Sequence, residues 1–192
     1  MLFQITGIAI MAAFYSIYIG KMISQKRKGI ETDQIAKGKK DKSVFAVEAI
    51  LKVATYSIVI IEMISIGLNT SRLPNLLRIV GTCLGMLGVA VFGLSVWTMK
   101  DSWRAGIPEK DKTIMVTNGI YRISRNPAFL GFDLVYIGIL SMFFNWVLLF
   151  FTAFSVLMLH LQILQEEKFL PTAFGDAYIN YTKKVCRYLG RK

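Results

Sequence analysis

The chain of 192 residues is 54% hydrophobic and only 18% charged, and its mean hydropathy is +0.50. This balance is typical of an integral-membrane protein and excludes an ordinary soluble globular domain. The length suits a single membrane domain, residues 1–192, and the net charge of +11 has two possible sources, nucleic-acid binding or membrane topology.

Four long apolar runs follow one another along the chain: Leu2–Ile19, Val44–Leu68, Leu76–Met99 and Phe129–Leu164. The first lacks a basic leader and a small-residue cleavage site, so we interpret it as a span and not as a signal peptide. Each of the first three suits one helix across about 30 Å of hydrocarbon. The fourth would extend about 54 Å as one helix, and Asn145-Trp146 in its middle predicts a turn. We therefore expect an all-α fold with about five transmembrane helices, of which the fourth and fifth form a hairpin.

The basic residues gather in segments that five spans would place on one side of the membrane. Eight Lys and Arg residues lie in Lys21–Ser43, six in Lys100–Ala128 and six after Leu164, which together are 20 of the 23 in the chain. By the positive-inside rule, this distribution puts the N-terminus outside and the C-terminus in the cytoplasm. No aromatic-basic recognition pattern accompanies the charge, so we expect no nucleic-acid partner.

Two polar segments on the predicted cytoplasmic side have their own patterns. The lysine-rich segment Lys26–Lys42 predicts a solvated, mobile loop that touches anionic lipid head groups. Tyr178, Tyr181, Val185 and Tyr188 have the 3-4-3 spacing of an amphipathic helix over Asp176–Tyr188, which we expect along the membrane interface. A structural role as a lid or anchor and direct contact with a ligand both fit this helix.

Arg125-Asn126-Pro127 predicts the start of the fourth span, with Asn126 as the helix cap and Pro127 in the first helical position. This alone explains the tripeptide. A helix start at a membrane surface also presents free N–H groups, which suit the carboxylate or hydroxyls of a polar cofactor. The two readings are compatible.

The fifth span ends in two adjacent acids, Glu166 and Glu167. They are either simple interfacial acids or the holders of a cationic or hydroxyl-rich ligand. Asp133, His160 and Gln162 lie within about two turns of the same membrane face, and ionisable residues inside a membrane are functional hypotheses by default. Glu48 near a span end and the deeper Glu62 receive no role from the sequence.

The chain lacks several common signatures. It has no Gly-x-Gly-x-x-Gly, no metal-ligand cluster and no nucleophile elbow. Cys83 lies in an apolar run and Cys186 in the polar tail, so we expect no disulfide. The small-residue spacing of Gly81, Gly85 and Gly88 predicts close packing of the third span against another helix.

Two polar cassettes flank the predicted hairpin. The first, Gly119-Ile-Tyr-Arg-Ile-Ser-Arg-Asn-Pro-Ala-Phe-Leu-Gly131, resembles the Gly-x-Tyr-x-x-x-Arg-His-Pro-x-Tyr-x-Gly signature of the isoprenylcysteine carboxyl methyltransferase family, to which phospholipid methyltransferases are related. The second, from Glu166-Glu167 through Phe174-Gly175 to Arg187, resembles the second signature of that family, and Ser102–Ile107 is similar to a stretch of its bacterial members. The resemblance covers about half the chain, from Trp97 to Arg187.

This resemblance implies a methyltransferase whose cofactor is S-adenosylmethionine, bound at the cytoplasmic face by segments 100–128 and 165–192. The acceptor would enter from the bilayer between helices. Carried over by motif position, the cofactor-binding residues are Thr113, Ile114, Met115, Val116, Tyr121, Arg125, Asn126, Pro127, Ala128, Phe129, Glu166 and Glu167. No metal is implied.

The sequence departs from the family pattern at positions that bear on the substrate. Asn126 replaces the His of the first signature, and Phe129 replaces a Tyr. Gln162 stands where authentic isoprenylcysteine methyltransferases carry an Arg implicated in holding the prenylcysteine carboxylate, and a neutral amide cannot form that bidentate pair. The acceptor is thus a prenylcysteine-like carboxylate or a lipid amine, thiol or hydroxyl, which Gln162, with His160 or Asp133, would orient as the catalytic group.

Two other functions fit the pattern of spans and cassettes. One is an integral-membrane reductase that uses NADPH, since sterol-reductase families share a similar hairpin and C-terminal site. The other is a non-enzymatic transporter or membrane-organising protein. Because the chain resembles bacterial members, we expect a bacterial inner membrane, with the lipid bilayer and a lipophilic acceptor as partners and no obligate protein partner.

Overall fold

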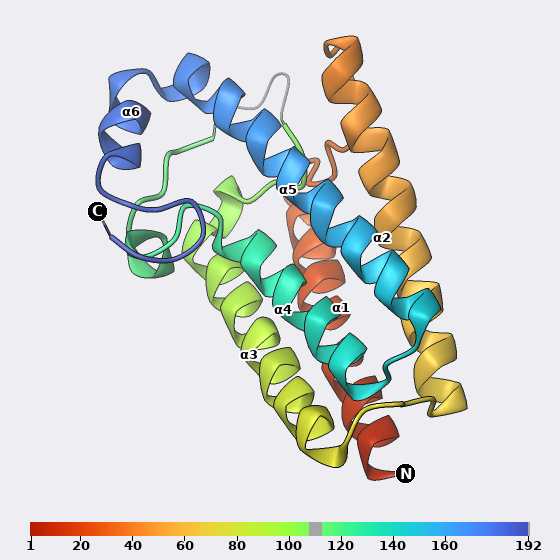
Figure 1. Cartoon of the computed structure of the whole chain (residues 1–192). Helices are drawn as coiled ribbons and strands as arrows, with labels where there is room; N and C mark the ends of the chain where they lie inside the picture. Colours follow the sequence, from red (N-terminus) through yellow and green to blue (C-terminus); the bar gives the residue numbers. More distant parts are fainter. Residues whose placement is uncertain (108–112, 192) are drawn as a thin grey trace.

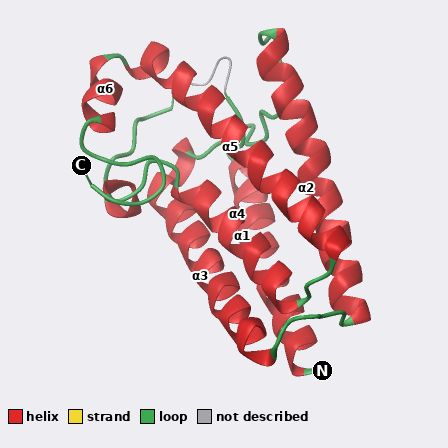
Figure 2. Cartoon of the chain, viewed as in Figure 1, coloured by secondary structure: helices red, strands yellow, loops and turns green. Residues whose placement is uncertain are grey.

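The computed structural model describes residues 1–107 and 113–191. Six α-helices follow in chain order: α1 Leu2–Arg27, α2 Lys42–Leu68, α3 Asn75–Met99, α4 Pro127–Met142, α5 Trp146–Phe174 and α6 Asp176–Thr182. Short 3₁₀ helices cover Lys100–Ser102 and Gly119–Arg122. Within the described ranges there is no β-strand, and the predicted all-α fold is confirmed (Figure 2).

The five longer helices form one bundle (Figure 1). α1, α2, α3 and α5 are long and apolar enough to cross a membrane, whereas α4 is apolar but has only 16 residues, about 24 Å of helix. Large apolar side chains remain exposed around the bundle, among them Ile60, Leu76 and Phe150. Exposed apolar surface of this extent marks the face that meets lipid.

The hairpin of α4 and α5 turns where the sequence predicts it. α4 ends at Met142, and Asn145 caps α5 by accepting a hydrogen bond from the backbone N–H of Leu148 at 2.9 Å. α5 then continues past the predicted end at Leu164 to Phe174, ten residues further along the chain. The helix therefore carries Glu166 and Glu167 beyond its most apolar part, to the end of the bundle opposite the N-terminus (Figure 1).

Glycines allow α3 and α4 to lie in backbone contact, as the spacing predicts. A Cβ atom at Gly81 would lie 2.6 Å from the carbonyl oxygen of Gly138, and one at Gly88 would lie 2.8 Å from that of Gly131. Side chains larger than hydrogen would force the helices apart. This contact sets where the N-terminus of α4, and with it the first cassette, lies.

The segment between α1 and α2 is not the solvated loop that its lysines predict. The backbone N–H of Gln34 donates to the carbonyl of Ala105 at 2.7 Å. In turn, the N–H of Ala105 donates to the carbonyl of Thr32 at 3.0 Å. Gln25, fully buried, donates to the carbonyl of Trp103. The segment is therefore built into the end of the bundle, because its backbone groups find partners that the sequence pattern does not reveal.

The predicted helix over Asp176–Tyr188 is wrong in its second half. α6 ends at Thr182, after which the chain turns and the N–H of Cys186 donates to the carbonyl of Gly190 at 2.9 Å. The N–H of Arg125 donates to the carbonyl of Cys186 at 3.1 Å. These bonds tie the tail to the first cassette, which a continued helix could not do.

Candidate active site

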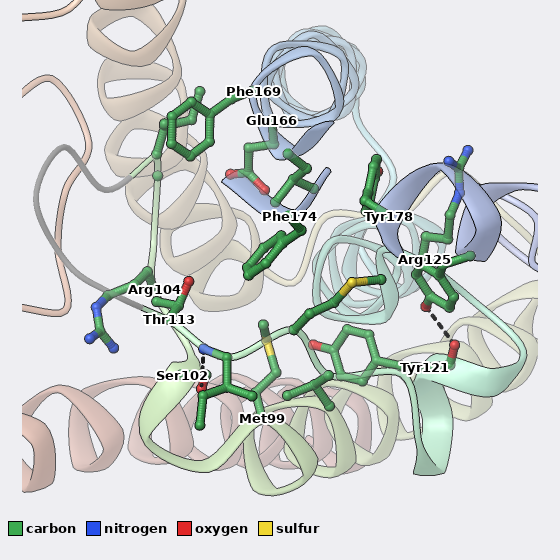
Figure 3. A pocket seen from close by; sticks show the side chains of 17 residues that line it. Met99, Ser102, Arg104, Thr113, Tyr121, Arg125, Glu166, Phe169, Phe174 and Tyr178 are labelled. Atoms are coloured by element: carbon green, nitrogen blue, oxygen red, sulfur yellow. Dashed lines mark hydrogen bonds between the residues drawn. The ribbon is translucent and has the colours of Figure 1, made fainter. Parts of the chain in front are cut away.

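A cavity of about 130 Å³ lies where the two cassettes meet at the end of the bundle (Figure 3). We call it the interface cavity. Its lining residues are Met99, Ser102, Arg104, Gly106, Ile107, Thr113, Ile114, Met115, Val116, Tyr121, Arg125, Glu166, Phe169, Leu170, Phe174, Tyr178 and Tyr181. They come from the end of α3, the segment after it, the last turns of α5, and α6.

Glu166 places its side-chain carboxylate in the lining of this cavity. Its carboxylate points into the space between the cassettes (Figure 3), and its Oε1 accepts a hydrogen bond from Gln162 Nε2 at 3.1 Å. Ser102 on the facing segment accepts a hydrogen bond from the N–H of Ile114 through its Oγ at 3.3 Å. The cavity thus combines one carboxylate with hydroxyls and aromatic rings, a set that suits a ligand with hydroxyls and positive charge.

Three tyrosines close the side of the cavity next to Arg125. The hydroxyl of Tyr181 donates to the carbonyl of Tyr121 at 2.6 Å, which fixes α6 against the first cassette. Burial raises the pKa of Tyr178 to about 12, and burial also raises the pKa of Tyr121 and of Tyr181. The three hydroxyls therefore stay protonated at neutral pH and are able to donate hydrogen bonds, as that of Tyr181 does.

Glu167 does not line the cavity and performs a different task. Its Oε1 lies 3.1 Å from an Nη of Arg125, and its Oε2 accepts hydrogen bonds from Arg187 at 2.8 and 3.0 Å. The Nδ2 of Asn126 also donates to Glu167, at 3.3 Å. The hydrogen bond to Glu167 raises the pKa of Arg187. Glu167 thus joins α5, the start of α4 and the tail.

Asn126 precedes α4 as predicted, but it does not cap the helix with its side chain. No side-chain cap bond is present there, and the Asn126 amide instead donates to Glu167 and to the carbonyl of Arg187. Asn126 is buried under the tail. The Asn126 amide thus links the start of α4 to α5 and to the tail.

A second cavity, of about 580 Å³, lies between α1, α2, α4 and α5, and we call it the apolar cavity. Its lining residues are Tyr15, Tyr18, Ile19, Met22, Asp33, Ile35, Leu51, Lys52, Thr55, Tyr56, Val59, Ile60, Trp103, Arg104, Ala105, Gly106, Ala128, Phe129, Phe132, Tyr136, Leu159 and Gln162. Ile19, Tyr56 and Ile60 are also exposed on the lipid-facing surface. Arg104 and Gly106 line both cavities, so the two spaces adjoin at this segment, which we call the junction.

The structure distributes the predicted cofactor residues over three places. Thr113–Val116, Tyr121, Arg125 and Glu166 line the interface cavity. Ala128 and Phe129 line the apolar cavity instead. Pro127 is buried at the start of α4, and Asn126 and Glu167 belong to the contacts beneath the tail.

Of the residues predicted to orient an acceptor, Gln162 lines the apolar cavity, and His160 and Asp133 line neither cavity. The Nδ1 of His160 shares a hydrogen bond with the hydroxyl of Tyr188, on which its ring also stacks. Burial and the nearby Asp133 raise the pKa of Tyr188. His160 and Asp133 thus gather at the tail, apart from Gln162.

Sequence reasoning missed Glu48, which is fully buried and lies between Ile107 of the interface cavity and Gln162 of the apolar cavity. Its Oε2 accepts hydrogen bonds from Lys40 Nζ at 2.6 Å and from the N–H of Ala36 at 2.8 Å, and its Oε1 accepts one from the N–H of Ile107 at 3.2 Å. The available signal was an acid just inside a span with a lysine eight residues earlier. Asp33, paired with Lys52 at 3.4 Å, was missed as well.

Residues 73–177 match a protein family described as phospholipid methyltransferase. This match spans more than half of the sequence and includes α3, α4, α5 and Glu166. The chain belongs to this family. It is also similar to the protein-S-isoprenylcysteine O-methyltransferase of Schizosaccharomyces pombe, with 36% identity over 73 residues. That match covers 38% of this chain and 31% of the relative, so the chain spans about a third of the length of the relative. The family resemblance read from the two cassettes is confirmed.

Proposed function

We propose that this protein is a methyltransferase that uses S-adenosylmethionine and methylates a lipophilic acceptor within the membrane. The observation that carries the proposal is that the two cavities share the lining residues Arg104 and Gly106. One cavity is polar and aromatic and lies at the end of the bundle, and the other is apolar and borders the lipid-facing surface. A water-soluble methyl donor and a membrane-embedded acceptor would reach each other at this junction.

The residues of the interface cavity fit the cofactor by their chemistry. The carboxylate of Glu166 would accept hydrogen bonds from ribose hydroxyls, and the protonated hydroxyl of Tyr178 would donate one to a carboxylate. The ring of Phe174 offers an apolar face to an adenine. The space of about 130 Å³ is smaller than the usual 300–1,000 Å³ of ligand pockets. Met99 and Met115 narrow it, and their flexible side chains can yield to a ligand.

The bound cofactor supplies an electrophilic methyl group on sulfur, and the chain supplies alignment. Holding the two reactants in line is worth about 7–11 kcal/mol, so a covalent nucleophile is not required. Gly106 has a φ of +88° and packs closely on the chain before α2, since a Cβ atom there would lie 2.9 Å from the backbone nitrogen of Ile35. The buried rings of Trp103 and Tyr121 would exclude water on either side of this segment. Gln162 would orient the acceptor from the apolar cavity.

Two chemical classes of acceptor fit the protein. The name of the yeast relative supports a prenylcysteine-type carboxylate. The amide of Gln162, in place of a guanidinium, supports a lipid amine, thiol or hydroxyl. Either acceptor would enter from the bilayer between α1 and α2, where Tyr56 and Ile60 line the apolar cavity and are exposed.

We further infer a bacterial inner membrane, with the N-terminus outside and the cavities on the cytoplasmic side. The distribution of basic residues supports this orientation. The N-terminus lies at the end of the bundle opposite α6 (Figure 1), and Tyr178 and Tyr181 of α6 line the interface cavity, as this orientation requires. Segments 100–128 and 165–192 would then bind the cofactor from the cytoplasm.

The test is calorimetric binding of S-adenosylmethionine to the protein in lipid nanodiscs, with the variants Glu166→Ala and Glu31→Ala. Glu31 is an exposed acid outside both cavities, so its loss controls for charge. We expect saturable binding that Glu166→Ala abolishes and Glu31→Ala preserves. Absence of binding to folded wild-type protein would contradict the proposal.

A further inference from the structure

The side-chain amide of Gln162 lies between two carboxylates. Its Nε2 donates to Glu166 Oε1 at 3.1 Å and to Glu48 Oε1 at 3.5 Å. The nitrogen end of the amide therefore faces both carboxylates, and both of its N–H bonds are used.

The other end of the same amide has no partner. Gln162 is 1% exposed, and among the described residues nothing donates to its Oε1. A buried carbonyl oxygen without a donor is costly and rare in proteins. Because Gln162 lines the apolar cavity, a molecule in that cavity is the available source of the missing donor.

We infer that Gln162 is a specificity-determining residue, whose Oε1 accepts a hydrogen bond from an N–H or O–H of the acceptor and so selects against carboxylates. The inference rests on the proposed function and narrows its acceptor class. A carboxylate at this position would put its oxygens against a carbonyl oxygen, with no bond gained. It would also approach the carboxylates of Glu48 and Glu166, both within reach of the same amide.

The basic residues of the apolar cavity do not reverse this preference. Lys52 lies 3.4 Å from Asp33, with which it forms an ion pair. Arg104 donates to the carbonyls of Asp101 and Trp103 at 2.7 and 2.9 Å. The carboxylate of Asp33 adds a second acceptor to the lining, which again favours a donor on the bound molecule.

An amine can donate the hydrogen bond to Gln162 and accept the methyl group with the same nitrogen atom. One N–H donates to Gln162 while the nitrogen lone pair forms the new carbon–nitrogen bond. The electron pair of the broken carbon–sulfur bond stays on sulfur, which becomes a neutral thioether, and the product ammonium releases its extra proton to water. A hydroxyl offers the same donor but must lose its proton during the transfer.

The test measures binding of acceptor probes without any cofactor, so that it does not depend on methyl transfer. Trp103 lines the apolar cavity and is buried, whereas Trp97 and Trp146 are exposed. In a Trp97→Phe/Trp146→Phe background, Trp103 fluorescence reports occupancy of the cavity. The probes in nanodiscs are dodecylamine, dodecyltrimethylammonium, dodecanol, dodecyl methyl ether and dodecanoate.

We expect each donor-bearing probe to bind about tenfold more tightly than its donor-free counterpart, and dodecanoate to bind weakly. Tighter binding of dodecylamine than of dodecanol would identify an amine as the acceptor, and the reverse order a hydroxyl. In Gln162→Leu, the advantage of the donor should disappear, while binding of dodecyl methyl ether should persist and show that the cavity is intact.

Preference of the wild-type protein for dodecanoate, or equal affinity for probes with and without a donor, would overturn the inference. These results come from wild-type protein, so a Gln162→Leu variant that fails to fold leaves the test decisive. Failure of the proposed function would show separately, as absent binding of S-adenosylmethionine in the calorimetric experiment.

Discussion

Glu166 and Glu167 are neighbours in sequence, yet the structure gives them opposite roles, which replacement of each by glutamine should separate. Glu167→Gln keeps the shape of the side chain but removes the charge that pairs with Arg125 and Arg187. Glu166→Gln removes a charge that faces the interface cavity and accepts a hydrogen bond from Gln162. We expect the first variant to lose stability and the second to lose affinity for the cofactor.

The size of the loss in Glu167→Gln follows from burial. The side chains of Glu167 and Arg125 are 12% and 10% exposed, and the Arg125 Nε already lacks a partner among the described residues. Removing one partner of a buried pair costs about 3–5 kcal/mol, and incomplete burial favours the lower end, about 3 kcal/mol. Arg187 is 37% exposed, so its pair adds at most about 1 kcal/mol.

The assay is thermal unfolding of each variant in nanodiscs, followed by tryptophan fluorescence. For a chain of this length, about 3 kcal/mol lowers the Tm by roughly 6–12 °C. Glu166→Gln replaces a partly buried carboxylate by a neutral group and should leave the Tm unchanged or raised. If Glu167→Gln has the same Tm as the wild-type protein, or if Glu166→Gln has the lower Tm of the two variants, the division of roles is wrong.

Two further substitutions test the fold that supports the site. Gly138→Leu should lower the Tm strongly, because a Cβ atom there would lie 2.6 Å from a backbone nitrogen of α3. Gly67→Leu is the control and should leave the Tm unchanged, because a Cβ atom at Gly67 meets nothing within 4 Å. Equal Tm values for the two variants would contradict the contact between α3 and α4. Glu48→Ala should expose the N–H of Ala36 to faster hydrogen–deuterium exchange, by about tenfold for a lost hydrogen bond to a charged group, and unchanged exchange would show that another group holds this loop.

Local patterns in the sequence determined the helices, the turn at Asn145, the glycine contact of α3 and the two cassettes. These features depend on periodicity, chain length and turn chemistry, which act over a few residues. The helix start at Pro127 was predicted correctly for the same reason. The role of the Asn126 side chain as a helix cap was predicted wrongly, because its hydrogen-bond partners are Glu167 and the carbonyl of Arg187, which lie far away in sequence.

What only the tertiary structure decided is which polar groups meet. Glu48, Gln162 and Glu166 come from two helices, and their alignment depends on how α2 packs on α5. The same holds for the loop after α1, whose lysines predict solvent exposure but whose backbone is bound to Ala105. Sequence alone determined that this chain is a membrane bundle with two paired cassettes, since hydrophobic patterning is a local property. Burial and hydrogen bonding between distant segments decided that one acid faces a cavity and its neighbour holds the tail, because only the packed chain brings those partners together.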